Sequence, residues 1–197
     1  MSVCEKLRTS LLVGLIAFSL TACGSQGSNE QSTEQNNKQP GNSVVQEAEG
    51  DYDFGIDKKR IDISQTQGPI KYTIYNIRVA IFKPDESYKN NYKGKDTLTY
   101  VEMDYGMENT SADKVDILPI TGKLLLDDKT QVELDYMKSD ASTTELAGNA
   151  KIQGKYGFYI PSENIPKHFK LFCKGPVLFK GDDFTEFENF ELDINLN

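Results

Sequence analysis

Short stretches in which apolar and polar residues alternate dominate the sequence after residue 50 and restrict its fold more than any other feature. In the clearest one, residues 101–107, Val, Met, Tyr and Met occupy every second position, with Glu, Asp and Gly between them. Successive side chains of a strand point to opposite faces, so this pattern predicts an antiparallel sheet with one packed face and one wet face. No stretch of helix length shows a sustained 3.6-residue apolar stripe. The sequence therefore predicts an all-β domain.

The stretch from Ile70 to Ile81 contains a break in this alternation. Its apolar side chains occupy positions 70, 72 and 74 and then 77, 79 and 81, so the phase shifts by one residue near Asn76. One extra residue in a strand produces such a shift. We expect a β-bulge at this point.

Further strands are predicted over residues 152–160, 169–173 and 187–194, and a hairpin over 124–134 turns at Asp127-Asp128-Lys129. Residues 140–149 could form a short helical turn. Seven to nine short strands within about 145 residues, separated by Gly, Pro, Asn and Asp, are typical of a two-sheet sandwich. We expect this antiparallel β-sandwich over residues 51–197, and a closed barrel is the competing architecture.

The N-terminal residues have the three parts of a secretory signal. Lys6 and Arg8 precede an apolar run at residues 11–20, and small residues then lead to Cys23. The run is about ten residues long, whereas a helix needs roughly twenty to cross the hydrocarbon core. We therefore expect residues 1–22 to be a signal peptide that is removed, not a permanent transmembrane anchor.

The tetrapeptide Leu20-Thr21-Ala22-Cys23 resembles the lipobox of bacterial lipoproteins. That resemblance implies a thioether from the Cys23 sulfur to diacylglycerol and a further acyl chain, such as palmitate, on the new amino terminus. Two or three acyl chains hold a protein on a bilayer far better than one does. We expect a lipid-anchored, extracytoplasmic protein on the outer face of the cell membrane. The alternative is an ordinary secretory signal that has a cysteine near its end.

Residues 23–50 are expected to form the lipidated cysteine and a flexible tether. Gly, Ser, Asn, Gln, Glu and Thr predominate there, with almost no large apolar side chain. Such a segment cannot bury enough surface to offset its chain entropy. A Gly/Ser-type coil of this length has a root-mean-square span of about 30 Å, enough to lift a domain off the lipid headgroups.

The charge balance and the cysteine count exclude two further classes. The chain has 22 Lys and Arg against 30 Asp and Glu, a net charge of −8, and no basic stripe, so we expect no binding to nucleic acid. Of the three cysteines, Cys4 lies in the signal peptide and Cys23 is expected to carry lipid. Cys173 is then without an intramolecular partner, and no disulfide framework is expected.

Four segments, in their order along the chain, are similar to immunoglobulin-like lipoproteins of Gram-positive bacteria. They are Tyr100–Ser111, Gly122–Asp128, Gly154–Pro161 and Pro166–Phe172. The resemblance implies an immunoglobulin-like sandwich akin to the mycobacterial immunoprotective extracellular antigen fold. Most members of that family are domains of unknown function, so the resemblance implies a fold and a location but no reaction.

The residues that could carry catalysis are few. His168 is the only histidine, so a histidine-based zinc site or a Ser-His-Asp arrangement has one possible member. Cys173 lies five residues further along a predicted strand, and an odd spacing sends the two side chains to opposite faces. Cys173 shares its phase with Phe169 and Leu171, which places it in the core. Since no phosphate loop, nucleophile elbow or HExxH motif is present either, the sequence predicts no enzyme and no cofactor.

Three acidic clusters could hold calcium through oxygen ligands, although none has a recognised loop spacing. They are Asp51, Asp53 and Asp57; Asp127 and Asp128; and Asp182, Asp183, Glu186 and Glu188. We expect solvated turns and no metal site there. A small-ligand or metal-binding accessory lipoprotein is nevertheless the alternative function. A hydrolase that uses Asp182 and Glu186 as acid and base is a third.

The loop of residues 84–96 has the composition of a binding loop. It places Tyr88 and Tyr92 among Asn, Ser and Gly, and tyrosine offers a large amphipathic surface at a low cost in entropy. The alternative is that both tyrosines pack against the domain. We expect a non-catalytic binding or scaffolding module that contacts an envelope protein or a cell-wall component through loops at the end of the sandwich.

Overall fold

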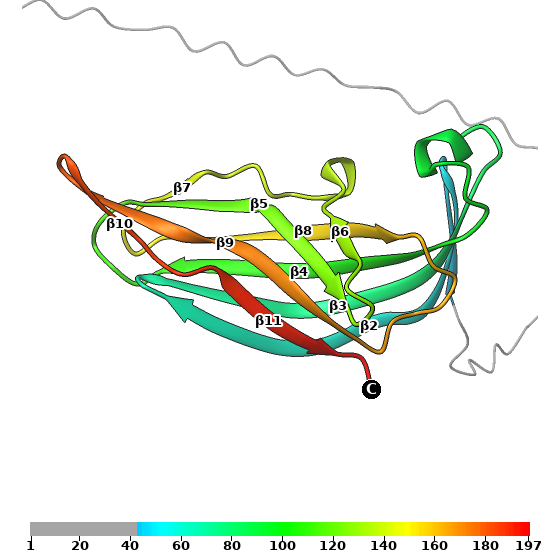
Figure 1. Cartoon of the computed structure of the whole chain (residues 1–197), viewed down its shortest axis with the longest axis horizontal. Coiled ribbons are helices and arrows are strands. Elements are labelled where there is room, and N and C mark those ends of the chain that lie inside the picture. Colours follow the sequence, from blue (N-terminus) through cyan, green and yellow to red (C-terminus); the bar gives the residue numbers. More distant parts are fainter. Residues whose placement is uncertain (1–42) are drawn as a thin grey trace, which may run out of the picture. The chain divides into compact units, whose positions relative to one another are not determined.

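The computed structural model describes residues 43–197, which form two antiparallel sheets (Figure 1). The expected signal peptide, Cys23 and most of the expected tether lie outside the described residues. Sheet A has five strands in the order β1, β2, β3, β4, β8. Their bounds are Ser43–Glu47, Gly50–Gln67, Ile70–Pro84, Leu98–Asn109 and Lys151–Ile160.

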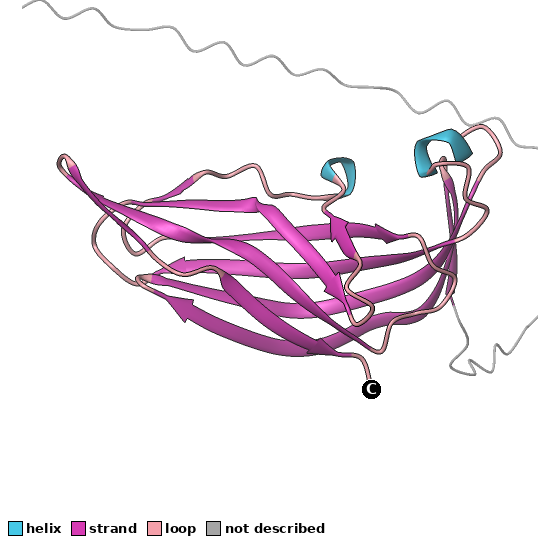
Figure 2. Ribbon diagram, viewed as in Figure 1, coloured by secondary structure: helices cyan, strands magenta, loops and turns pink. Residues whose placement is uncertain are grey.

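Sheet B has six strands, with β9 and β5 in its centre. Strands β10 and β11 both pair with β9, while β6 and β7 both pair with β5. The bounds of β5, β6, β7, β9, β10 and β11 are Val115–Leu126, Gln131–Glu133, Glu145–Leu146, His168–Lys180, Asp183–Glu186 and Phe190–Asn195. Two single-turn 3-10 helices, η1 (Lys89–Tyr92) and η2 (Tyr136–Lys138), complete the described structure (Figure 2).

The predicted all-β sandwich is confirmed, with a larger number of strands than the seven to nine expected. Residues 43–197 contain eleven strands, because β1, β7 and β10 are short pieces that carry little alternation. Residues 140–149 form no helix: Glu145 and Leu146 make the short strand β7, which pairs with β5, and residues 148–149 form a turn. Between residues 43 and 197, no helix is long and apolar enough to cross a membrane.

Alternating side chains fill the space between the two sheets. Ile70, Tyr72 and Ile74 from β3 meet Leu124 from β5 and Phe169 from β9 in one core cluster, all of them buried. Burying such side chains contributes about 1.5–3 kcal/mol each relative to exposure. The alternation therefore fixes which face of each strand points inward.

The boundary of the folded domain lies earlier in the chain than residue 51. Strand β1 occupies residues 43–47, inside the segment expected to be tether, and pairs with β2 across a turn that ends at Gly50. Gly50 has a φ of 150°, and a β-carbon there would come within 2.2 Å of the Lys83 carbonyl oxygen. Val44 and Val45 remain 65 % and 39 % exposed. Because backbone hydrogen bonds hold β1 with little apolar burial, a prediction based on composition does not detect it.

Candidate functional site

The face of sheet A that points away from sheet B carries three hollows in a row. Their volumes are about 240, 480 and 590 Å³. The first and second share Asp140 and Lys155, and the second and third share Tyr75 and Gln153. We call this continuous surface the outer groove. It follows β4 from Tyr100 to Glu108, a length of about 27 Å at roughly 3.4 Å per residue.

The two larger hollows are balanced in charge, although the chain as a whole is acidic. Four carboxylates and four basic side chains line them: Asp62, Asp104, Glu108, Asp140, Arg60, Lys71, Lys151 and Lys155. Neutral hydrogen-bonding groups, among them Ser64, Thr73 and Gln153, lie between these charges. A surface of this kind selects a ligand by hydrogen bonding and shape more than by net charge.

Tyr75 lies where the second and third hollows meet. The register between β3 and β4 shifts between Ile74 and Asn76, which confirms the predicted bulge and makes Tyr75 the extra residue. Its ring lies against Gly106 of β4, where a β-carbon on Gly106 would come within 2.7 Å of the Tyr75 phenol oxygen. Only a glycine leaves the ring this room. The half-buried ring therefore forms a flat aromatic surface in the floor of the outer groove.

Short polar contacts fix the side chains around Tyr75. Asn76 Nδ2 donates to Asp104 Oδ2 over 2.8 Å, and Lys58 Nζ lies 3.8 Å from the same oxygen. The hydroxyls of Ser64 and Thr73 are 2.8 Å apart. Groups that are already oriented lose less entropy when a ligand binds, which favours recognition of a defined arrangement of donors and acceptors.

The groove ends at an aromatic cluster that is also on the outer face of sheet A. Its buried members are Tyr52, Phe54, Ala80, Phe82, Leu98 and Tyr100, with Tyr92 and Tyr159 packed against them. The ring centroids of Tyr52 and Phe82 are 4.5 Å apart, and those of Tyr100 and Tyr159 are 5.0 Å apart. This outer-face cluster makes the aromatic end of the sheet rigid.

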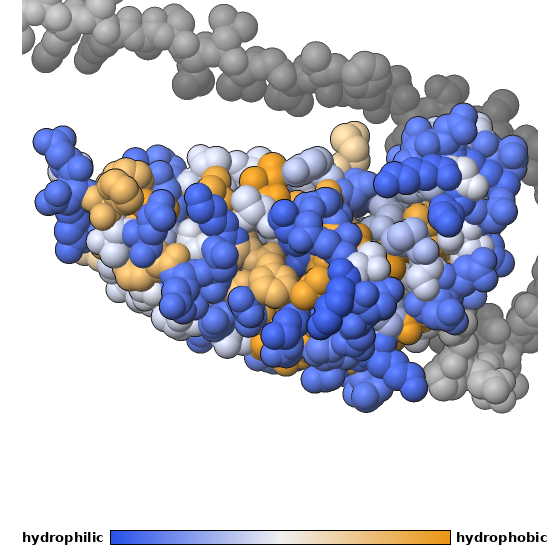
Figure 3. Space-filling model, in the orientation of Figure 1, coloured by the Kyte–Doolittle hydropathy of each residue, from blue (hydrophilic) through white to orange (hydrophobic). Residues whose placement is uncertain are grey.

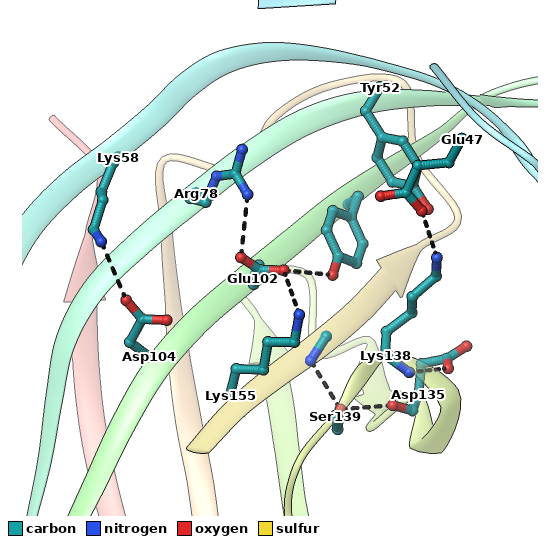
Figure 4. Close-up of polar contacts among 12 residues, drawn as sticks. Glu47, Tyr52, Lys58, Arg78, Glu102, Asp104, Asp135, Lys138, Ser139 and Lys155 are labelled. Atoms are coloured by element: carbon teal, nitrogen blue, oxygen red, sulfur yellow. Dashed lines mark hydrogen bonds and ion pairs between the residues drawn. The ribbon is translucent and has the colours of Figure 1, made fainter. Parts of the chain in front are cut away.

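Glu102 is the most enclosed charge of the groove, with a side chain that is 14 % exposed. Its carboxylate lies 3.4 Å from Arg78 Nη1 and 3.6 Å from Lys155 Nζ, and the Tyr100 hydroxyl donates to it over 3.1 Å (Figure 4). Burial, and then the charge of Glu102, raise the pKa of Tyr100, so the phenol stays a proton donor. With three donors around it, this carboxylate orients its neighbours.

The segment of residues 135–140 crosses from sheet B and covers the edge of β8. The amides of Asp135 and Asp140 donate to the carbonyls of Gly157 and Lys155, and the Gly157 amide donates to Ser139 Oγ. These bonds satisfy an otherwise open sheet edge. A side chain at Gly157 would have no room, because a β-carbon there would lie 2.6 Å from Lys138 Cβ.

Lys138 holds this segment on the outer face. Its Nζ lies 2.8 Å from Glu47 Oε2 (Figure 4). The same atom lies 3.2 Å from Glu49 Oε2 and 5.6 Å from the centre of the Tyr52 ring. Burial opposes the charge of Lys138, but hydrogen bonds to both carboxylates raise its pKa above the usual value. The ammonium group therefore ties β1 to η2 over the aromatic end of the groove.

The two tyrosines predicted to bind a partner differ in their surroundings. Tyr92 packs against Phe82 and Tyr159, and its hydroxyl donates to Glu49 over 3.1 Å. Burial raises the pKa of Tyr92 to about 12. Tyr88 precedes η1 and is half-buried. The structure thus gives Tyr92 a packing role, and partner binding at either residue stays a prediction.

His168 and Cys173 do not meet. His168 Nδ1 lies 2.7 Å from Asp127 Oδ1, and its Nε2 lies 3.4 Å from Asp193 Oδ1. Cys173 is buried in the core, where burial raises the pKa of its thiol to about 11. The prediction that the two side chains occupy opposite faces of one strand is confirmed.

The acidic clusters lie apart from one another along the described chain. Asp51, Asp53 and Asp57 lie within β2 and not in the expected turn, because that strand already begins at Gly50. Asp127 and Asp128 lie in the β5–β6 turn, Asp182 lies in the β9–β10 turn, Asp183 and Glu186 lie in β10, and Glu188 follows β10. Within residues 43–197, no three His, Cys, Asp or Glu side chains are arranged so that they could share a metal ion. The expected lipidation site, Cys23, lies outside this range.

The sequence did not predict three features of the groove: the flat surface of the Tyr75 ring, which we call the platform, the enclosed position of Glu102 and the contacts of Lys138. The phase shift near Asn76 was a usable signal for the first, because a bulge turns an additional side chain outward. Glu102 appeared only as one polar residue in an alternating strand. Lys138 is 91 residues from Glu47, a separation that leaves no local pattern.

No family model matches the chain, and no curated protein matches it. A crystal structure of a functionally unknown protein from Listeria monocytogenes EGD-e is similar, with a TM-score of 0.54 and 11 % identity over 75 % of this chain and 89 % of that one. A conserved hypothetical protein from Bacillus anthracis has a TM-score of 0.43 and 11 % identity over 60 % of this chain and 92 % of that one. The Listeria structure supports the fold alone.

Proposed function

We propose that this chain is a non-catalytic binding module, anchored by lipid at the outer face of the cell membrane, which holds a cell-wall polymer along the outer groove. The observation that carries the proposal is the continuity of three hollows past the exposed face of Tyr75. A groove about 27 Å long is open along the sheet and fits an extended chain better than a compact small molecule.

The chemistry of the groove supports the choice of a wall polymer. Such polymers combine sugar rings, amides, carboxylates and amines in one extended chain. The ring of Tyr75 offers a flat surface for an apolar ring face, while Asn76, Gln153 and Ser64 offer amide and hydroxyl partners. The equal numbers of acidic and basic groups match a polymer that carries both signs of charge.

The anchoring part of the proposal rests on the sequence. The tetrapeptide that ends at Cys23, the polar segment behind it and the resemblance to immunoglobulin-like lipoproteins of Gram-positive bacteria support it. A tether would let the groove reach a polymer that lies above the lipid headgroups.

Anchoring is tested by expression of the full-length chain in a Gram-positive host that is fed an alkyne-labelled fatty acid. Wild type should incorporate the label and stay with the membrane. Cys23→Ala should lose the label and enter the medium, whereas Cys4→Ala should behave as wild type. A Cys23→Ala protein that keeps both label and location would contradict the anchor.

Binding is tested by co-sedimentation of the full-length chain with purified, protein-free cell walls. Tyr75→Ala should lower the amount bound at least about fivefold, because it removes the platform but no core contact. Tyr136→Ala is the matched control, since Tyr136 is 67 % exposed and lies outside the groove. Equal binding of wild type and Tyr75→Ala would contradict the proposal.

A further inference from the structure

The hairpin of β9 and β10 exposes two phenylalanines at the end of the molecule opposite the aromatic cluster. Phe179 and Phe184 face each other across the hairpin, with ring centroids 6.2 Å apart, and are 47 % and 63 % exposed. Figure 1 shows the hairpin projecting beyond the rest of sheet B, and Figure 3 shows apolar side chains gathered at that end. Paired aromatic side chains in water are typical of an interaction surface.

A hollow of about 380 Å³ adjoins these rings. Leu118 of β5, Val177 of β9 and the two phenylalanines provide its apolar lining, and Asp116, Glu145 and Glu186 provide acidic groups. A β-carbon at Gly175 would lie 2.2 Å from the Glu188 carbonyl oxygen, so the backbones of these two residues approach each other closely. The hollow therefore offers an apolar floor with carboxylates around it.

One edge of β10 has no strand beside it. Among the described residues, β10 pairs only with β9 and forms the end of sheet B. The outward N–H and C=O groups of its four residues can accept another strand, as in the addition of an extended peptide to a sheet edge.

The charges around the hairpin favour a basic partner. Lys180 lies 3.7 Å from Asp113, and Lys114 lies 2.9 Å from Glu145, so these two lysines already have carboxylate partners. Carboxylates at the hairpin and its hollow have no ion-pair partner within residues 43–197: Asp116, Asp182, Asp183 and Glu186. A lysine or arginine beside them would gain attraction from several carboxylates.

We propose that the β9–β10 hairpin is a second binding surface, which takes an extended peptide segment of a partner protein with alternating apolar and basic side chains. The peptide adds to the free edge of β10, its apolar side chains reach Phe179, Phe184 and the hollow on one face of the sheet, and its basic side chains lie on the other face, beside Asp183 and the turn residue Asp182. A second copy of this chain is disfavoured as the occupant. Two antiparallel β10 strands in register would place Asp183 opposite Glu186, and like charges in such positions destabilise the pairing.

The test measures the fluorescence anisotropy of a short labelled peptide in which lysine alternates with valine, titrated with the full-length chain in detergent. Wild type should bind it and should bind the corresponding glutamate–valine peptide at least about tenfold more weakly. Phe179→Ser with Phe184→Ser should weaken the lysine–valine complex at least about tenfold. Tyr136→Ser with Met137→Ser is the matched control, because these exposed side chains lie on η2.

Charge reversal is a second test, which measures the preference between the two peptides and does not depend on the aromatic pair. Asp183→Lys with Glu186→Lys should reverse the preference between the two peptides. Equal affinity of wild type and the serine pair, or no preference between the peptides, would overturn the proposal. So would hairpin-dependent binding to vesicles of phosphatidylglycerol without peptide binding, or self-association that the serine pair removes.

The two proposals fail separately. The serine pair should still sediment with cell walls, and Tyr75→Ala should still bind the peptide, since the groove and the hairpin share no lining residue.

Discussion

The ring of Tyr75 rests on Gly106, the residue of the neighbouring strand that leaves it room. A β-carbon at position 106 would lie 2.7 Å from the phenol oxygen and 2.8 Å from Cε2. The contact exists because the bulge between Ile74 and Asn76 turns one additional side chain of β3 to the outer face. A glycine and a bulge thus produce the aromatic floor of the groove.

Gly106→Ala should reduce binding to cell walls about as much as Tyr75→Ala, with a change in unfolding free energy within about 1 kcal/mol. The clash falls on the far end of the Tyr75 side chain, which can swing away and lose its place in the groove. Urea denaturation and co-sedimentation measure the two effects. Gly157→Ala is the contrasting variant: its β-carbon meets the Lys138 backbone oxygen at 2.9 Å, so it should destabilise by about 1–3 kcal/mol. A Gly106→Ala protein that binds cell walls as well as wild type would show that binding does not depend on the position of the Tyr75 ring.

Glu102→Ala should destabilise the domain by about 1–3 kcal/mol, because it leaves the buried hydroxyl of Tyr100 without its acceptor and removes the partner of Arg78. Glu133→Ala is the matched control. That carboxylate is 63 % exposed and lies 3.5 Å from Lys123, and such surface pairs contribute at most about 1 kcal/mol. Midpoints of urea unfolding at an unchanged slope compare the two variants. Equal shifts would show that Glu102 is an ordinary surface charge.

The single histidine makes one ion pair directly measurable. A hydrogen bond to Asp127, and further contact with Asp193, raise the pKa of His168 above 6.5. Its stabilising contribution is therefore fully present below the unfolded pKa and is lost as the pH rises through the folded value. NMR titration of the imidazole should show a pKa above 6.5, and Asp127→Asn should lower it. A pKa that Asp127→Asn leaves unchanged would contradict this pairing.

Cys173 should resist alkylation in the folded protein. It is 1 % exposed and burial raises the pKa of its thiol to about 11, so little thiolate forms at neutral pH. Peptide mass spectrometry after treatment with iodoacetamide should find Cys173 unmodified until urea unfolds the chain. Labelling in buffer at the rate of a free thiol would show that the core opens at this strand.

The sequence predicted best where one residue pattern had one structural cause. Alternation over residues 101–107 predicted the inward face of β4, and the phase shift near Asn76 predicted the bulge, because both follow from the geometry of a single strand. The burial of Cys173 followed from the same periodicity.

What the sequence could not predict depends on contacts between distant segments. Lys138 reaches Glu47 across 91 residues, and Glu102 becomes enclosed only when Arg78 and Lys155 arrive from the two neighbouring strands. Tyr92 had the composition of a binding loop around it, yet Phe82 and Tyr159 provide a packing surface. Composition describes a segment, whereas burial depends on what the rest of the chain places beside it.

Chemical-shift mapping shows residue by residue whether the outer face of sheet A binds a wall polymer. Isotope-labelled protein would be titrated with soluble, enzymatically released wall fragments. We expect the largest shifts at amides of Thr73, Tyr75, Gly106 and Gln153, and we expect Tyr75→Ala to remove them. Shifts confined to the β9–β10 hairpin or to the loop around Tyr88, with none along β3, β4 and β8, would contradict this expectation.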